Sequence, residues 1–419
     1  MMYRRLFPIL FFASLLLLGG TAFTLDWGFF GHRRINRLAV FTLPSDMLYF
    51  YKSQIDYLTD HAVDPDKRRY ASKHEAIRHY IDIDHWGEMP FREVPRSWND
   101  VLIQYTSLDI VRSIGDTLSL QFRNWEGPFR DSTDFTRIAD SLQLSHQRLQ
   151  KLGSQYEKWF LAKIKPQYYE DEWTLDCEEI RFLLDDLGLD MDCQSVLATD
   201  HFSSYGILPY HLVQMQKRLT KAFEQRDAKR VLQLSADFGH YIGDAHVPLH
   251  TTENYNGQLT NQLGIHAFWE SRIPELFADQ RFDYFVGKAQ YIRNPEEFYW
   301  DIVLSSHALV DSVLGIEQDL RLRFPIDQQM CYDNRLERTI LTQCKEFADA
   351  YDRRMKGMVE NRMRGAILAI GSAWMTAWYD AGQPDLRELD ASGWLESMRK
   401  KRDREGQERG KIKGRQHEG

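Results

Sequence analysis

Apolar residues recur every three or four positions along most of this chain. The recurrence is clearest over three stretches, 209–225, 228–244 and 345–379. Residues with this spacing share one face of a helix, so the pattern predicts long amphipathic helices. Alternating apolar and polar positions next to hairpin turns are scarce. We therefore expect an all-α fold, with a single large multi-helix domain over 27–395.

The N-terminal segment has a different pattern. Arg4 and Arg5 precede an apolar run over 6–18, which small residues follow through Ala22. This order is typical of a signal peptide, which we assign to 1–26, and small-residue preferences favour cleavage after Ala22. The run is shorter than the ~20 residues that cross a bilayer. We expect an exported protein, periplasmic or extracellular, with an uncleaved N-terminal anchor as the alternative.

Two other segments depart from the helical pattern. The acidic, aromatic stretch near 153–199 predicts an insertion on the surface of the domain, and the charged segment 396–419 predicts a disordered tail. In an oxidising compartment the four cysteines can form two disulfides, with three possible pairings. We favour the pairing that is local in sequence, Cys177 with Cys193 and Cys331 with Cys344.

The net charge of −8 limits the function. It argues against a nucleic-acid binder that coats phosphates with Lys and Arg. It leaves room for an enzyme that takes phosphate esters, because bound cations can supply positive charge locally.

Potential metal ligands are concentrated in one region. His240 and Asp244 are four residues apart, as are His266 and Glu270, and His250 lies between the two pairs. Side chains four apart lie on the same face of a helix, so each pair can present a nitrogen and an oxygen to one ion. Such mixtures of imidazole and carboxylate commonly hold zinc.

Further candidates lie upstream. His79 follows an acidic loop that contains Asp64 and Asp66, and Trp27 and His32 follow the apolar N-terminal run. Together these residues resemble the zinc-dependent phospholipases C and the related zinc-dependent single-strand nucleases, which share one all-helical fold.

The resemblance implies a cluster of three zinc ions. The ligands would be Asp64, His79, His240 and Asp244 for the first ion; His250, His266 and Glu270 for the second; and Trp27, His32 and Asp244 for the third. Spacing favours Asp64 as the acidic ligand from this loop, and Asp66 is the alternative. In the family Trp27 would bind through a free amino group, but cleavage after Ala22 would leave only its amide, a poor ligand. We therefore expect two to three ions.

This constellation favours phosphodiester hydrolysis by a zinc-activated water that attacks phosphorus in line. Asp64 would orient this water or accept its proton, and Asp244 would bridge two ions. The expected partner is a phosphodiester substrate, either a phospholipid headgroup or single-stranded nucleic acid. Transient contact with a membrane surface is compatible with this reading, and no stable protein partner is implied.

Three functions remain open. The short interval from His250 to His266 and the use of Glu270 resemble phospholipase C, which we favour. Tyr80, which could stack on a base, and Asp82, which could read a base edge, resemble the single-strand endonuclease and 3'-nucleotidase branch. The third function is a non-catalytic secreted zinc-binding helical protein. The three obvious ligands of the second site leave an open position, which favours catalysis.

Overall fold

The computed structural model describes residues 29–69, 71–121, 146–167, 172–335, 338–389, 391, 393–398 and 400. The predicted signal peptide, Trp27 and most of the predicted tail lie outside these residues. Within them the chain is mostly helical.

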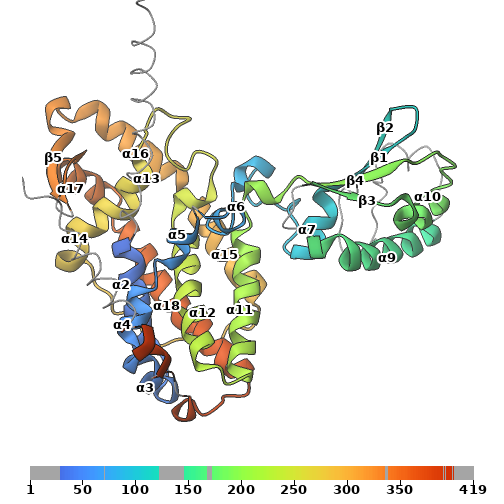
Figure 1. Ribbon diagram of the computed structural model, residues 1–419. Helices are drawn as coiled ribbons and strands as arrows, with labels where there is room; N and C mark the ends of the chain where they lie inside the picture. Colours follow the sequence, from blue (N-terminus) through green and yellow to red (C-terminus); the bar gives the residue numbers. More distant parts are fainter. Residues whose placement is uncertain are drawn as a thin grey trace, which may run out of the picture.

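A helical body surrounds α12 (Ala228–Ala245), which packs against α2, α4, α11 and α18 (Figure 1). The other α-helices of this body are α2 (Phe29–Ala39), α3 (Ser45–Ser53), α4 (Ile55–Asp60), α5 (Asp64–Arg69), α6 (Lys73–Ala76), α11 (Leu208–Glu224), α13 (Ile265–Ala267), α14 (Ile273–Arg281), α15 (Pro295–His307), α16 (Val310–Arg323), α17 (Lys345–Arg354) and α18 (Met358–Asp380). Its shorter helical turns are η1 (Val40–Thr42), η2 (Ile83–Trp86), η5 (Ser203–Tyr205), η6 (Pro248–Thr251), η7 (Phe268–Arg272), η8 (Ile326–Gln328) and η9 (Leu386–Glu388).

The three stretches with helical periodicity are helical. The first two correspond to α11 and α12, whereas the third is divided into α17 and α18. Gly357 separates these two helices with a φ of 77°, a left-handed conformation that glycine adopts without steric cost.

Helix α12 begins at a side-chain cap and ends deep in the protein. The Asp227 carboxylate accepts a hydrogen bond from the Arg230 backbone N–H at 2.9 Å, which satisfies a free donor of the first turn. Further along, α12 packs closely on α2 through Gly239 and Gly243. A Cβ at Gly243 would lie 2.8 Å from His32 Nδ1, and one at Gly239 would overlap the Asn36 amide. The two glycines therefore allow the close approach of α2.

The expectation of an all-α fold is wrong for a second, smaller core. Its elements are α7 (Trp98–Tyr105), β1 (Thr106–Val111), β2 (Thr117–Gln121), α9 (His146–Lys163), η3 (Lys165–Gln167), β3 (Glu172–Leu175), η4 (Cys177–Ile180), α10 (Arg181–Leu187) and β4 (Ser195–Asp200). The strands form an antiparallel sheet in the order β2-β1-β4-β3, which lies to one side of the helical body (Figure 1).

The second core has its own set of buried apolar residues, between Leu102 and Ala198. The predicted insertion, 153–199, supplies much of this core, and residues 102–120 together with Leu152 supply the rest. The chain enters and leaves the sheet at adjacent points, because Thr106 pairs with Asp200 in the β1–β4 register. The His201 N–H also donates to the Tyr105 carbonyl at 3.0 Å.

A two-stranded hairpin of β5 (Met330–Arg335) and β6 (Arg338–Gln343) lies in the helical body. Disulfides join Cys177 to Cys193 and Cys331 to Cys344, which confirms the sequence-local pairing. Two disulfides are typical of an oxidising, exported environment. Among the described residues, no helix combines the length and apolar character that a membrane span requires.

Replacing Cys177 and Cys193 together by Ser should destabilise the second core by about 3 kcal/mol, because the disulfide closes a short loop in the unfolded chain. Hydrogen exchange of backbone amides in β1 and β4 would measure this loss. The amides of α12 are the internal control and should keep their protection. An equal loss of protection in α12 would contradict the existence of two separately stabilised cores.

Candidate metal centre

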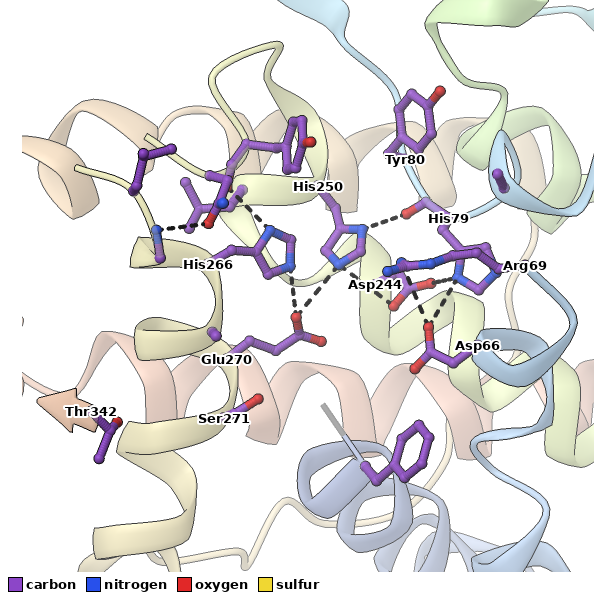
Figure 2. A pocket seen from close by; sticks show the side chains of 18 of the residues that line it. Asp66, Arg69, His79, Tyr80, Asp244, His250, His266, Glu270, Ser271 and Thr342 are labelled. Carbon is purple, nitrogen blue, oxygen red and sulfur yellow. Dashed lines mark hydrogen bonds and ion pairs between the residues drawn. The ribbon is translucent and has the colours of Figure 1, made fainter. Parts of the chain in front are cut away.

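The histidines and carboxylates singled out in the sequence converge from several elements of the helical body (Figure 2). Helix α12 carries His240 and Asp244 one turn apart, and α2 carries His32. His79 lies just after α6, and His250 lies in η6. His266 belongs to α13, and Glu270 belongs to η7, a π-helical turn of a kind often found at functional sites.

Hydrogen bonds to backbone carbonyls orient three of the imidazole rings. In each ring Nδ1–H donates to a carbonyl: His240 to Ala62 at 2.8 Å, His250 to His79 at 2.7 Å, and His266 to Tyr255 at 3.1 Å. A carbonyl oxygen can only accept, so the proton of each neutral ring is on Nδ1. Nε2 of each ring therefore faces the carboxylates, as a lone pair in the neutral ring and as an N–H donor in the protonated ring. Histidine ligands of metals are commonly oriented in this way.

The first group of donors surrounds His240. Its Nε2 lies 3.4 Å from Asp244 Oδ2, 3.7 Å from Asp66 Oδ1 and 3.1 Å from His79 Nδ1. Burial lowers the pKa of His240 to about 3, so the ring is neutral at physiological pH. A neutral, buried nitrogen beside the buried Asp244 carboxylate and the partly buried Asp66 carboxylate is an arrangement that a cation would stabilise.

The second group contains His250, His266 and Glu270. Glu270 Oε2 lies 2.8 Å from His266 Nε2 and 3.6 Å from His250 Nε2. Burial alone would raise the pKa of Glu270, but hydrogen bonds from His250 and His266 hold it well below its usual range. Glu270 is therefore an ionised oxygen donor next to two imidazoles.

His32 connects the two groups. Its Nε2 lies 3.3 Å from Asp244 Oδ1 and 3.3 Å from Glu270 Oε1, and its ring stacks on His240 with centroids 3.9 Å apart. Burial disfavours the charged ring, yet hydrogen bonds to Asp244 and Glu270 outweigh this effect and raise the pKa of His32 to about 10. Two carboxylates thus converge on one position and attract positive charge there.

Asp244 and Glu270 each face two groups. Asp244 Oδ2 faces His79 and His240, whereas Oδ1 faces His32 and lies 3.9 Å from His250 Nε2. Glu270 uses one oxygen toward His250 and His266 and the other toward His32. Three sets of donor atoms lie close together, and within each set the atoms are within 4.8 Å of one another: first, Asp66 with His79 and His240; second, His250 with His266 and Glu270; and third, His32 with His240 and Asp244. The first and third sets share His240, and the contacts of Glu270 with His32 and of Asp244 with His250 link the second set to them. Buried groups of this kind could hold metal ions.

The structure favours Asp66 over Asp64 as the acidic residue from the loop before His79. Asp66 Oδ1 lies 3.9 Å from His79 Nδ1, whereas the Asp64 carboxylate bonds His61 at 2.5 Å and Lys67 at 2.8 Å. Both residues lie in α5, where positions two apart point about 200° away from each other. Only one of them can face the centre, so the preference for Asp64 on spacing is corrected.

A cavity of about 740 Å³ opens over this centre. Tyr80 and Asp82 line it, as do Asp66 and Glu270, whereas His32 and His240 are buried beneath its surface. Trp27, the third predicted ligand near His32, lies outside the described residues.

The sequence analysis missed Arg69 and Tyr255, which also line the cavity. Arg69 follows Asp66 by one helical turn, and its Nη1 lies 3.7 Å from Asp66 Oδ1. The sequence analysis treated this segment as a loop, so the spacing of three residues between Asp66 and Arg69 was not interpreted as one helical face. Tyr255 gave no signal because it belongs to a loop without periodicity.

Comparison with known proteins adds no assignment. No protein-family model matches this chain, and no curated protein is significantly similar to it.

Substituting Asp66 and Asp64 separately by Asn should distinguish the two residues. Asp66→Asn should weaken divalent-metal binding by about 10-fold or more, because it removes a charge that faces the buried imidazoles. Asp64→Asn is the matched control and should leave metal affinity unchanged. Competition with a chromogenic chelator would measure both affinities, and a larger loss in Asp64→Asn would reverse the correction.

Proposed function

We propose that this protein is a zinc-dependent phosphodiester hydrolase of the phospholipase C type and that its buried centre holds two to three zinc ions. One observation carries the proposal: three neighbouring nitrogen and oxygen donor sets, linked by His240, Asp244 and Glu270, lie at the base of a single cavity. The mixture of imidazole and carboxylate suits zinc, and shared carboxylates are expected where cations lie close together.

When bound, zinc would lower the pKa of water, neutralise phosphate oxygens and stabilise the leaving alkoxide. The chain supplies the groups that position the reactants. Asp66 belongs to the first donor set and lines the cavity, so it would orient a water or accept its proton, the role first considered for Asp64. Arg69 lines the same wall and offers a guanidinium to a phosphate oxygen.

The accessibility of the second donor set favours catalysis over a structural role for zinc. His250, His266 and Glu270 provide three ligands, and His266 and Glu270 line the open cavity. Structural zinc sites are closed by four protein ligands, whereas catalytic sites keep one position for water or substrate. A non-catalytic zinc-binding protein is therefore the weaker explanation.

The lining of the cavity bears on the substrate. Leu263, Met330 and Leu341 give one side an apolar character that suits a lipid. Tyr80 and Asp82 on the wall support the second candidate, a single-strand nuclease, because an aromatic ring can stack on a base. Burial and the nearby carboxylates of Asp84 and Glu253 raise the pKa of Asp82 to about 7.

Dialysis against a chelator should abolish hydrolysis of phosphatidylcholine, and added zinc should restore it. His266→Ala should lower zinc affinity about 10- to 100-fold and reduce turnover with it. His85→Ala is the control, because His85 is exposed and does not line the cavity. Hydrolysis that persists after complete removal of metal would exclude the proposed chemistry.

A paired assay on phosphatidylcholine and on single-stranded DNA and RNA should show preference for the phospholipid. The nuclease candidate makes a different prediction for Tyr80→Ala: loss of stacking, worth about 1–3 kcal/mol per base, would raise KM for DNA by about 5-fold or more. Tyr49→Ala is the control, because Tyr49 is exposed on α3, away from the cavity. Efficient DNA cleavage with this dependence on Tyr80 would favour the nuclease.

A further inference from the structure

The β5–β6 hairpin has an apolar face toward solvent. Exposed and covered residues alternate along β5, and Met330 and Tyr332 are on the exposed face, where Tyr332 pairs with Leu341 of β6. Tyr332 is 78% exposed and Leu341 is 55% exposed. An antiparallel ribbon with one buried face normally presents polar residues on the other. The exposed apolar residues therefore require a separate explanation.

A second group of exposed apolar residues lies in the loop between η6 and α13. It consists of Tyr255, Leu259 and Leu263, the last of which is 74% exposed. Hydrogen bonds fix this loop: Asn254 Nδ2 donates to Thr260 Oγ1 at 3.0 Å, and the Leu259 N–H donates to Asn254 Oδ1 at 2.8 Å. The exposure of these side chains is thus part of an ordered loop.

Both groups border the cavity above the metal centre. Tyr255 and Leu263 line it from the loop, and Met330 and Leu341 line it from the hairpin. Leu259 belongs to the same loop and Tyr332 to the same exposed face of the hairpin, and neither lines the cavity. We refer to these residues as the apolar rim, which consists of Tyr255, Leu259, Leu263, Met330, Tyr332 and Leu341.

The hairpin edge of the rim is tied to the segment that carries Glu270. Arg272, which is buried in η7, forms an ion pair with Asp333 at 2.8 Å and donates to the Gln343 carbonyl at 3.2 Å. The Cys331–Cys344 disulfide closes the base of the hairpin. The rim and the second donor set therefore form one connected unit.

We propose that the apolar rim rests on the surface of a phospholipid aggregate, so that the cavity mouth faces the lipid headgroups. This inference builds on the proposed phosphodiesterase function. A protein or a second copy of this chain on the rim would cover the cavity mouth and exclude the substrate, whereas a lipid surface brings the substrate with it. Single-stranded nucleic acid would need cations along its phosphates, and among the described residues that line the cavity Arg69 is the single Lys or Arg.

The test uses full-length, zinc-loaded protein and the double variant Leu259→Ser/Tyr332→Ser. Both residues are exposed members of the rim that do not line the cavity. Phe285→Ser is the matched control, because Phe285 is 82% exposed in another part of the helical body. Each protein is assayed for flotation with long-chain phosphatidylcholine vesicles, for hydrolysis of those vesicles, and for hydrolysis of a short-chain phosphatidylcholine kept monomeric.

We expect the double variant to lose about 10-fold or more in vesicle binding and vesicle hydrolysis, because two apolar side chains no longer leave water. Its hydrolysis of the monomeric lipid and its zinc content should match those of the unaltered protein, and Phe285→Ser should behave normally. Unchanged vesicle binding in the double variant, or an equal loss in Phe285→Ser, would overturn the proposal. The proposal would also be overturned if the double variant lost binding to single-stranded DNA but still bound vesicles normally.

The two proposals fail in different ways. If the unaltered protein hydrolyses no monomeric phosphodiester, the phosphodiesterase function is wrong, and flotation still decides whether the rim binds lipid. If monomeric lipid is hydrolysed and flotation does not depend on the rim, only the docking surface is wrong.

Discussion

The buried carboxylate of Asp244 is the charge around which the helical body is organised. Its side chain is 1% exposed. Burial would raise its pKa, but the neighbouring imidazoles hold it well below its usual range, so it remains ionised. A buried charge without partners is strongly destabilising. The segments that supply its partners, which include α2 and the segment after α6 that carries His79, must therefore pack against α12 together.

Two irregular features of the backbone make this convergence possible. Gly243 has no side chain, so the ring of His32 can approach α12 and reach Asp244. The π-helical turn at Phe268–Arg272 carries Glu270, and its carboxylate spans from His266 to His32. Each feature would weaken an isolated helix, and each occurs beside a donor atom of the centre. At these two positions the chain loses some helix stability, and in return the side chains of the buried polar cluster reach one another.

Sequence periodicity was sufficient for α11 and α12 and for the contacts of residues four apart, such as His266 and Glu270. The cysteine pairing also followed from separation along the chain. These features are local, so the sequence contains most of the information that determines them.

The remaining features depend on contacts between distant residues. The strands of the second core are only four to six residues long. Strand β1 pairs with β4 across about 90 positions of the sequence, so no local sequence pattern predicted the sheet. The choice between Asp64 and Asp66 depended on how α5 is rotated against α12, which tertiary packing decides. Arg69 and Tyr255 reach the cavity for the same reason.

The cross-strand pair of Thr106 and Asp200 has a consequence for the architecture of the whole chain. Because the polypeptide departs from the helical body and returns at neighbouring residues, the segment between them is a side branch rather than a link. The separation of the two anchoring ends does not depend on how many residues the branch contains. The branch can therefore be lengthened, shortened or exchanged while the helices that carry the donor atoms keep their relative positions.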